Sequence, residues 1–192
     1  MRPMQAFLVS TGVVALGEVG DKTQLLALLL AARFRRPLPI IAGILVATLA
    51  NHAGAAWLGG WLAGLMGPTL LRWVIGGSFL AMAVWMLVPD KLDAPADGAR
   101  RLGVFGTTVL AFFFAEMGDK TQLATVALAA RYDDLFAVVA GSTLGMMLAN
   151  VPVVLLGGRA SRRLPMRLVH ALAAAVFALL GLATLLSGGR LL

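Results

Sequence analysis

Six long apolar segments fill most of this chain of 192 residues and limit what it can fold into. A helix needs about 20 apolar residues to cross the hydrocarbon core of a bilayer, and each segment is long enough. They are Met4–Ala32, Leu38–Leu65, Leu70–Val88, Leu102–Ala130, Leu135–Leu156 and Leu168–Leu186. Charged residues make up only 13% of the chain, whereas soluble domains contain about a quarter. We therefore expect an all-α, polytopic membrane protein with six transmembrane helices.

The composition also excludes several kinds of site and partner. The chain has no cysteine, which excludes disulfides, thiolate metal sites and cysteine nucleophiles. Its net charge is +7, but the arginines cluster between the apolar segments, where anionic lipid headgroups are the expected partner. The sequence has no basic, aromatic-interleaved stretch large enough to bind DNA or RNA, so we expect no nucleic-acid partner.

One polar sequence interrupts the first and the fourth apolar segments. It reads GEVGDKTQL at residues 17–25 and AEMGDKTQL at residues 115–123. A shift of 98 positions aligns the two copies and also aligns Ala42-Gly43 with Ala140-Gly141, so the chain is a duplication. Arg2 and the apolar run after it resemble a signal peptide. Because the internal copy repeats the same polar interruption, we expect the first segment to be retained.

The duplication divides the chain into two halves of three apolar segments each. The expected domains are a first three-helix repeat at residues 1–88, a linker at residues 89–101 and a second three-helix repeat at residues 102–192. The linker, PDKLDAPADGARR, is the only sustained polar stretch. Since each half has an odd number of segments, the two halves should lie in opposite orientations in the bilayer. Such inverted repeats are common in secondary transporters.

The distribution of lysine and arginine predicts the orientation of these halves. Outside the two motifs, ten such residues lie on the face that holds the linker, and four lie on the other face. The ten are Arg33, Arg35, Arg36, Lys91, Arg100, Arg101, Arg159, Arg162, Arg163 and Arg167, and the four are Arg2, Arg72, Arg131 and Arg190. Because cytoplasmic loops carry the excess of positive charge, we expect a cytoplasmic linker and extracytoplasmic termini.

The charged groups of the motifs lie deep in their apolar segments. Glu18 is about 14 residues into its segment, roughly 21 Å along a helix, and Glu116 lies at a matching depth. An ionised group at such depth costs about 2.5–3.5 kcal/mol, so these groups should face the protein interior and find partners. On a continuous helix Glu18, Asp21 and Lys22 share one face. Gly20, between them, allows a close helix approach or a local break.

Together the motifs supply four carboxylates and two ammonium groups. If all are ionised, their charges sum to −2, which one divalent cation or two protons would neutralise. The same carboxylates could therefore hold a metal on one side of the membrane and exchange it for protons on the other. Oxygen ligands suit hard cations such as Ca²⁺, Mg²⁺ or Mn²⁺. The expected metal ligands are Glu18, Asp21, Glu116 and Asp119, with supporting oxygens from Thr23, Gln24, Thr121, Gln122, Asn51 and Asn150.

Several roles stay open on the sequence alone. Lys22 and Lys120 shape the site through ion pairs, or they serve only to join helices, and the doubled motif favours the first role. Asn51 and Asn150 contact the cation or bond to a neighbouring helix. His52, which aligns with Asn150, is a ligand, a proton relay or a hydrogen-bonded packing residue, and we expect the last of these.

The paired E-x-G-D-K-[TS] motifs resemble those of the manganese/calcium cation–proton exchanger family, which includes a Golgi Mn²⁺/Ca²⁺ transporter of eukaryotes and manganese exporters of bacteria. The resemblance covers nearly the whole chain, and both halves match the motif. It implies a secondary active transporter, without a cofactor, that exports Mn²⁺ or Ca²⁺ from the cytoplasm in exchange for protons. In that family the motif acids bind the cation, here Glu18, Asp21, Glu116 and Asp119. The resemblance also implies a multi-pass location in a bacterial-type inner membrane.

Two other classes of function compete with a carrier. An intramembrane aspartyl protease is suggested by the Gly-Asp pairs at residues 20–21 and 118–119 and by Tyr132-Asp133. The presenilin-type pattern is G-x-G-D, however, whereas here the residue two before each glycine is Glu, and Asp133 lies at the end of a segment. A cation channel or a passive scaffold is the other alternative. We expect a carrier and not an enzyme.

Overall fold

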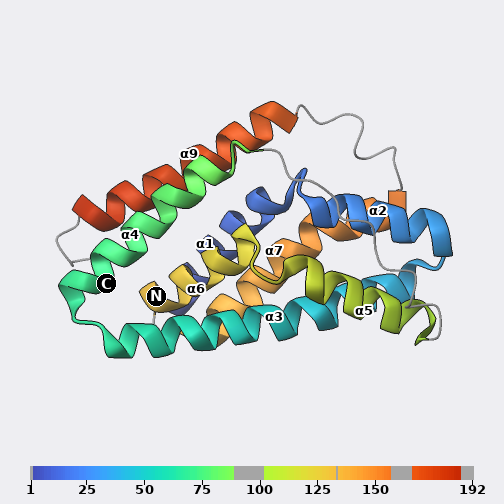
Figure 1. Cartoon of the computed structure of the whole chain (residues 1–192), viewed down its shortest axis with the longest axis horizontal. Coiled ribbons are helices and arrows are strands. Elements are labelled where there is room, and N and C mark those ends of the chain that lie inside the picture. Colours follow the sequence, from blue (N-terminus) through green and yellow to red (C-terminus); the bar gives the residue numbers. More distant parts are fainter. Residues whose placement is uncertain (1, 89–101, 133, 157–165, 187–192) are drawn as a thin grey trace.

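The computed structural model describes residues 2–88, 102–132, 134–156 and 166–186, and every secondary-structure element in these ranges is helical (Figure 1). The all-α class is therefore confirmed for this part of the chain. Its helices are α1 (Arg2–Glu18), α2 (Lys22–Phe34), α3 (Pro37–Leu65), α4 (Pro68–Trp85), α5 (Gly103–Glu116), α6 (Lys120–Tyr132), α7 (Leu135–Leu156) and α9 (Met166–Leu186). The predicted linker and the arginines at 159–163 lie outside the described residues.

Four of these helices are long and apolar enough to cross a membrane. They are α3, α4, α7 and residues Leu168–Leu186 of α9, and their bounds agree within a few residues with four of the six predicted segments. Their outer surface is apolar as well, because the structure leaves large hydrophobic side chains exposed, such as Leu148 and Leu182. A water-soluble protein rarely exposes so many such residues. The chain is thus a multi-pass membrane protein.

The first and fourth predicted segments are not continuous helices. Each is a pair of short helices, because α1 ends at Glu18 before α2 begins at Lys22, and α5 ends at Glu116 before α6 begins at Lys120. Gly20 and Gly118 lie at these breaks with φ of 85° and 76°, a left-handed conformation that only glycine adopts without strain. The prediction that Glu18, Asp21 and Lys22 share one face of a single helix is therefore wrong.

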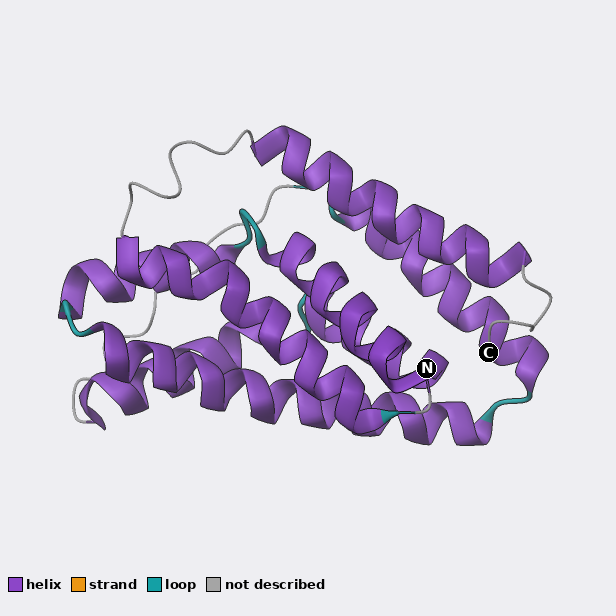
Figure 2. Ribbon diagram, turned by 180° about the vertical axis from the view of Figure 1, so that it is seen from behind, coloured by secondary structure: helices purple, strands orange, loops and turns teal. Residues whose placement is uncertain are grey.

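Helices from the two halves of the chain pack against each other. α1 lies against α7, and α3 lies against α5, α6 and α7. The last helices of the two halves, α4 and α9, run side by side along one edge of the molecule (Figures 1 and 2). Their buried rings Phe79 and Phe177 have centroids 6.2 Å apart. The core is thus shared between the halves, and the buried faces of the lateral pair α4 and α9 are part of it.

Two glycines that the repeat aligns lie at close approaches between the halves. A Cβ on Gly43 of α3 would lie 3.0 Å from the carbonyl oxygen of Phe105 in α5. A Cβ on Gly141 of α7 would lie 2.4 Å from the carbonyl oxygen of Phe7 in α1. Gly43 and Gly141 are aligned by the 98-residue shift, and so are Phe7 and Phe105. The same contact is therefore made twice, each time between one half and the other, and small residues permit it.

Candidate metal centre

The two helix breaks are built in the same way from motif residues. The backbone N–H of Asp21 donates to the carbonyl of Glu18 at 3.0 Å, and the N–H of Asp119 donates to the carbonyl of Glu116 at 3.0 Å. Each break is then closed by a glutamine side chain. The N–H of Gly20 donates to Oε1 of Gln24 at 3.0 Å, and the N–H of Gly118 donates to Oε1 of Gln122 at 2.7 Å.

These amide oxygens satisfy backbone groups that a helix end leaves without a partner. In addition, Nε2 of Gln24 donates to the carbonyl oxygen of Ala149 in α7 at 3.1 Å, which ties the first break to the second half. Both glutamines were predicted as supporting cation ligands. The structure places them in the walls of the breaks, where their oxygens already accept hydrogen bonds.

Carboxylates from both halves meet at the breaks. One oxygen from each of Glu18, Glu116 and Asp119 lies within 4.8 Å of the others, and all three side chains are buried. Two oxygens that bind Ca²⁺ from opposite sides are about 4.6–5.2 Å apart, since Ca–O distances are 2.3–2.6 Å. The three oxygens are therefore close enough to share one such cation.

Each glutamate presents one oxygen that accepts a hydrogen bond and one that does not. Oε2 of Glu18 accepts from the hydroxyl of Thr23 at 2.6 Å, and Oε2 of Glu116 accepts from the hydroxyl of Thr121 at 3.2 Å. Oε1 of each glutamate is buried without a hydrogen-bond donor in the described part of the chain. A buried carboxylate oxygen without a donor is costly unless a proton or a cation reaches it. The threonines thus orient the carboxylates and leave one oxygen of each for a ligand.

The motif lysines form ion pairs that cross between the halves. Nζ of Lys22 lies 2.9 Å from Oδ1 of Asp119, and Nζ of Lys120 lies 3.1 Å from Oδ1 of Asp21. Lys120 is only 3% exposed, whereas Lys22 is 25% exposed. Asp21 is buried as well but is not one of the three residues that share the 4.8 Å cluster. The two ion pairs join one break to the other and hold the aspartates at the centre of the molecule.

The remaining predicted site residues lie around this cluster. Asn51 of α3 donates to the carbonyl oxygen of Phe113 at 3.1 Å, so it bonds α3 to α5. Asn150 of α7 lies next to the carboxyl group of Glu18, although its Nδ2 donates within α7 to the carbonyl oxygen of Met146. His52 is fully buried, but neither ring nitrogen has a hydrogen-bond partner among the described residues, so the hydrogen bonds expected of this packing residue are not found there.

Some polar groups near the helix crossings were not identified from the sequence. The carbonyl oxygen of Ala149 binds Gln24, and the buried hydroxyls of Ser10, Thr48 and Thr143 have no partner in the described part of the structure. Single serines and threonines in apolar helices usually bond to their own helix, and no sequence signal separates these from the others. Asn150 aligns with His52 and not with Asn51. This amide was the one sequence signal that α7 contributes to the site.

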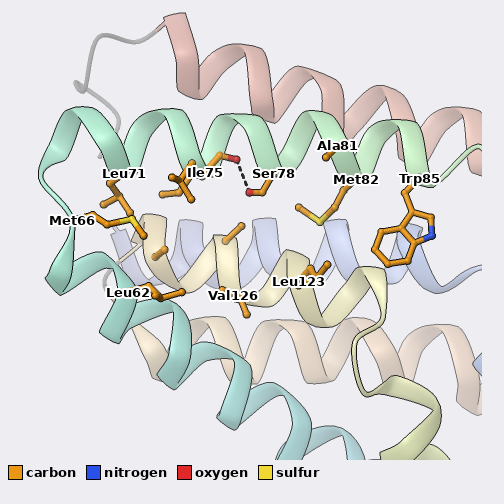
Figure 3. Close-up of a pocket in the computed structure, with 13 residues that line it drawn as sticks. Leu62, Met66, Leu71, Ile75, Ser78, Ala81, Met82, Trp85, Leu123 and Val126 are labelled. Atoms are coloured by element: carbon orange, nitrogen blue, oxygen red, sulfur yellow. Dashed lines mark hydrogen bonds between the residues drawn. The ribbon is translucent and has the colours of Figure 1, made fainter.

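A separate cavity of about 280 Å³ lies between α4 and α6 and is apolar (Figure 3). It is lined by Leu62, Met66, Leu71, Val74, Ile75, Ser78, Ala81, Met82, Trp85, Leu123, Val126, Ala127 and Ala130. The hydroxyl of Ser78 donates to the carbonyl oxygen of Ile75, so it offers no free hydrogen to a ligand. None of the motif acids lines this cavity, and it is therefore distinct from the carboxylate cluster.

The sequence of this chain is similar to those of several known proteins. A family model described as the divalent cation/proton antiporter GDT1 matches residues 6–94 and 104–190. A putative manganese exporter of Vibrio cholerae is 53% identical over 94% of this chain and 90% of its own length. A GDT1-like protein of Synechocystis is 28% identical over 81% of this chain and 84% of its own, and GDT1-like protein 5 of Arabidopsis thaliana is 28% identical over 96% of both. No solved structure matches the chain.

Proposed function

Because the chain belongs to the GDT1 family of divalent cation/proton antiporters, we propose that it exports Mn²⁺ from the cytoplasm in exchange for protons. The observation that carries this proposal is the cluster of Glu18, Glu116 and Asp119, in which both halves contribute oxygens within 4.8 Å of each other. The similarity to a putative manganese exporter supports Mn²⁺ as the cargo. Oxygen ligands also suit Ca²⁺, so Ca²⁺ is the second candidate ion.

The charges around the cluster explain how a cation and protons exchange. The four motif acids and the two lysines sum to −2 when all are ionised, and a divalent cation neutralises that charge. When the cation leaves, protons on the two glutamates restore neutrality, so the site is not left with unpaired buried charges. The lysine–aspartate ion pairs remain intact during this exchange and keep the two halves joined. Glu18, Asp21, Glu116 and Asp119 are thus the proposed metal centre, with hydroxyl support from Thr23 and Thr121.

We propose that the chain crosses the membrane six times, as two inverted repeats at residues 1–88 and 102–192. In this arrangement the pair α1–α2 crosses the membrane once as an interrupted helix, and the pair α5–α6 does the same. Transporters build ion sites near the bilayer midplane from interrupted helices of this kind. The family match, with one stretch in each half, supports the division. The excess of positive residues supports a cytoplasmic linker at 89–101 and extracytoplasmic termini. Reporter fusions test this orientation, and a cytoplasmic C-terminus would contradict it.

The alternative functions are less consistent with the ion pairs. An aspartyl protease needs two carboxylates that share one proton. Here Oδ1 of Asp21 and Oδ1 of Asp119 each form an ion pair with a lysine of the other half, an arrangement unlike two carboxylates that share a proton. A channel would need a continuous path for ions, whereas the three side chains of the cluster are buried. A carrier that exposes the cluster to one side at a time fits this arrangement best.

Transport by the purified protein in liposomes tests the proposal. With an outward-directed Mn²⁺ gradient and an inward-directed proton gradient, we expect saturable Mn²⁺ efflux that falls when the proton gradient is collapsed. The internal pH should fall in step with the efflux, because protons replace the cation. Liposomes without protein are the control. Mn²⁺ flux that does not depend on the proton gradient would favour a channel and would contradict an antiporter.

A further inference from the structure

The apolar cavity beside the lateral helix pair has the form of a groove along α4. The α4 residues that line it recur at helical spacing on one face, from Leu71 through Ser78 to Trp85 (Figure 3). α6 forms the opposite wall with residues such as Leu123 and Ala130. Fourteen residues separate Leu71 from Trp85, which corresponds to roughly 21 Å along a helix. One leaflet of a bilayer has a hydrocarbon thickness of about 15 Å, so the groove is long enough for an acyl chain.

Two arginines lie at the end of this groove that is formed by Leu71 and Ala130. Arg131 follows Ala130, is only 9% exposed and donates from Nη1 to the hydroxyl of Thr184 in α9 at 3.1 Å. Arg72 follows Leu71 in the first turns of α4. Nε of each arginine is buried without a hydrogen-bond acceptor among the described residues, and neither forms an ion pair within the described ranges.

Contacts with α9 place the two arginines at the same level. Gly76, one turn after Arg72, lies against Leu185 of α9, with a distance of 2.5 Å from a Cβ built on the glycine to Cγ of Leu185. Leu185 is the neighbour of Thr184, which accepts the hydrogen bond from Arg131. Both arginines therefore border the C-terminal end of α9. The two guanidinium groups have no carboxylate partner among the described residues and are suited to a phosphate group, which arginine binds through several hydrogen bonds.

Exposed tryptophans mark this end as the membrane–water interface. Trp57 and Trp61 lie in the last turns of α3, and Trp73 follows Arg72 in α4. All three are more than half exposed, at 64%, 53% and 58%. Tryptophan is enriched at the level of the lipid headgroups. A lipid phosphate is thus available at the height of the two arginines, and its acyl chain would extend along the groove toward Trp85.

We propose that this groove binds one anionic phospholipid, with its phosphate between Arg72 and Arg131 and one acyl chain between α4 and α6. The proposal does not rest on the carboxylate cluster, because none of the motif acids lines the groove. The lipid would fill the cavity between α4 and α6 and would join these two helices. An anionic headgroup is expected over a zwitterionic one, because the two arginines have no carboxylate partner within the described residues.

Native mass spectrometry of the delipidated protein tests the role of the arginines. With phosphatidylglycerol added, we expect one tightly retained lipid per chain, and weaker retention of phosphatidylcholine. Arg72→Gln and Arg131→Gln should each weaken phosphatidylglycerol retention about fivefold, since one basic residue contributes roughly 1 kcal/mol near an anionic lipid. Arg33→Gln is the matched control, because Arg33 is aligned with Arg131 by the repeat but lies far from the groove in sequence and is exposed. Equal retention of both lipids by the wild type, unchanged by Arg72→Gln, would overturn the proposal.

A second pair of variants tests the acyl-chain groove itself. Ala81 lines the groove and is exposed, so Ala81→Trp should fill it without disturbing the core and should abolish tight retention. Val84→Trp is the control, because Val84 is 68% exposed on the same helix and does not line the groove. Inorganic phosphate at millimolar concentration should not displace the lipid. Displacement by phosphate would show that the arginines bind an anion alone, and full retention in Ala81→Trp would show that the acyl chain does not lie in the groove. Either result would overturn the proposal.

Discussion

Glu18→Gln and Glu116→Gln are each expected to abolish Mn²⁺ transport while the protein still inserts into the membrane. Each glutamate is buried, contributes one oxygen to the cluster and has one oxygen without a hydrogen-bond donor among the described residues. Glutamine has nearly the shape of protonated glutamate, so the variant keeps the packing but loses one of the negative charges that hold the cation. Removing one partner from a buried ionic cluster costs about 3–5 kcal/mol. Flux at low Mn²⁺ concentration should therefore fall about 100- to 4,000-fold.

The same substitution at a distant acid provides the control. Asp134→Asn changes a carboxylate that accepts a hydrogen bond from the N–H of Ala137 at the start of α7 and lies outside the motifs. It should transport Mn²⁺ at close to the wild-type rate. Proteoliposomes that contain equal amounts of each protein allow the rates to be compared. If Glu18→Gln or Glu116→Gln kept wild-type flux, the assignment of the metal centre would be wrong.

The second large effect is expected when a lysine–aspartate pair is broken. Lys120→Met leaves the carboxylate of Asp21 without this ammonium in a buried site, and such a change typically costs about 3–5 kcal/mol of stability. Asp21→Asn should destabilise the protein for the reciprocal reason. The double variant should be more stable than the sum of the two single effects predicts, because buried ion pairs are often replaced by neutral groups at little cost.

Two double-mutant cycles show whether the ion pair between Asp21 and Lys120 joins the halves. Thermal unfolding midpoints of the single and double variants give a coupling between Asp21 and Lys120, and the same measurements give a coupling between Asp21 and its sequence neighbour Lys22. Because Lys120 Nζ lies 3.1 Å from Oδ1 of Asp21, the coupling across the halves should be the larger. A larger coupling within one motif would mean that each lysine serves its own half, and the crossed arrangement would be refuted.

Much of the helical framework could be predicted because it depends on the hydropathy of each segment alone. The segment Leu135–Leu156 was predicted with the bounds that α7 has, and Leu38–Leu65 differs from α3 by one residue. A long apolar run needs only its own composition to indicate a membrane helix. Interlocking of the halves was not predicted, because the contact of Gly141 with Phe7 depends on packing between residues far apart in the sequence.

The residues of the candidate site were proposed from the sequence, but the contacts between them were not. Glu18 and Glu116 stood out because a charged group in an apolar segment is expensive and therefore needs a role. Hydropathy does not distinguish a continuous helix from two short ones, so the turns at Gly20 and Gly118 were only one of two options. On a helix Lys22 would have been nearest to Glu18, whereas the break directs it to Asp119 of the other half.

A count of bound Mn²⁺ tests most directly whether the two halves hold one cation between them. Equilibrium dialysis against Mn²⁺, followed by elemental analysis, gives the number of ions per chain. We expect one ion bound by the wild type and none by Glu18→Gln or by Glu116→Gln, because each half supplies part of the same shell. Two ions in the wild type, with one remaining in each variant, would mean that each half binds its own metal and would contradict the shared site.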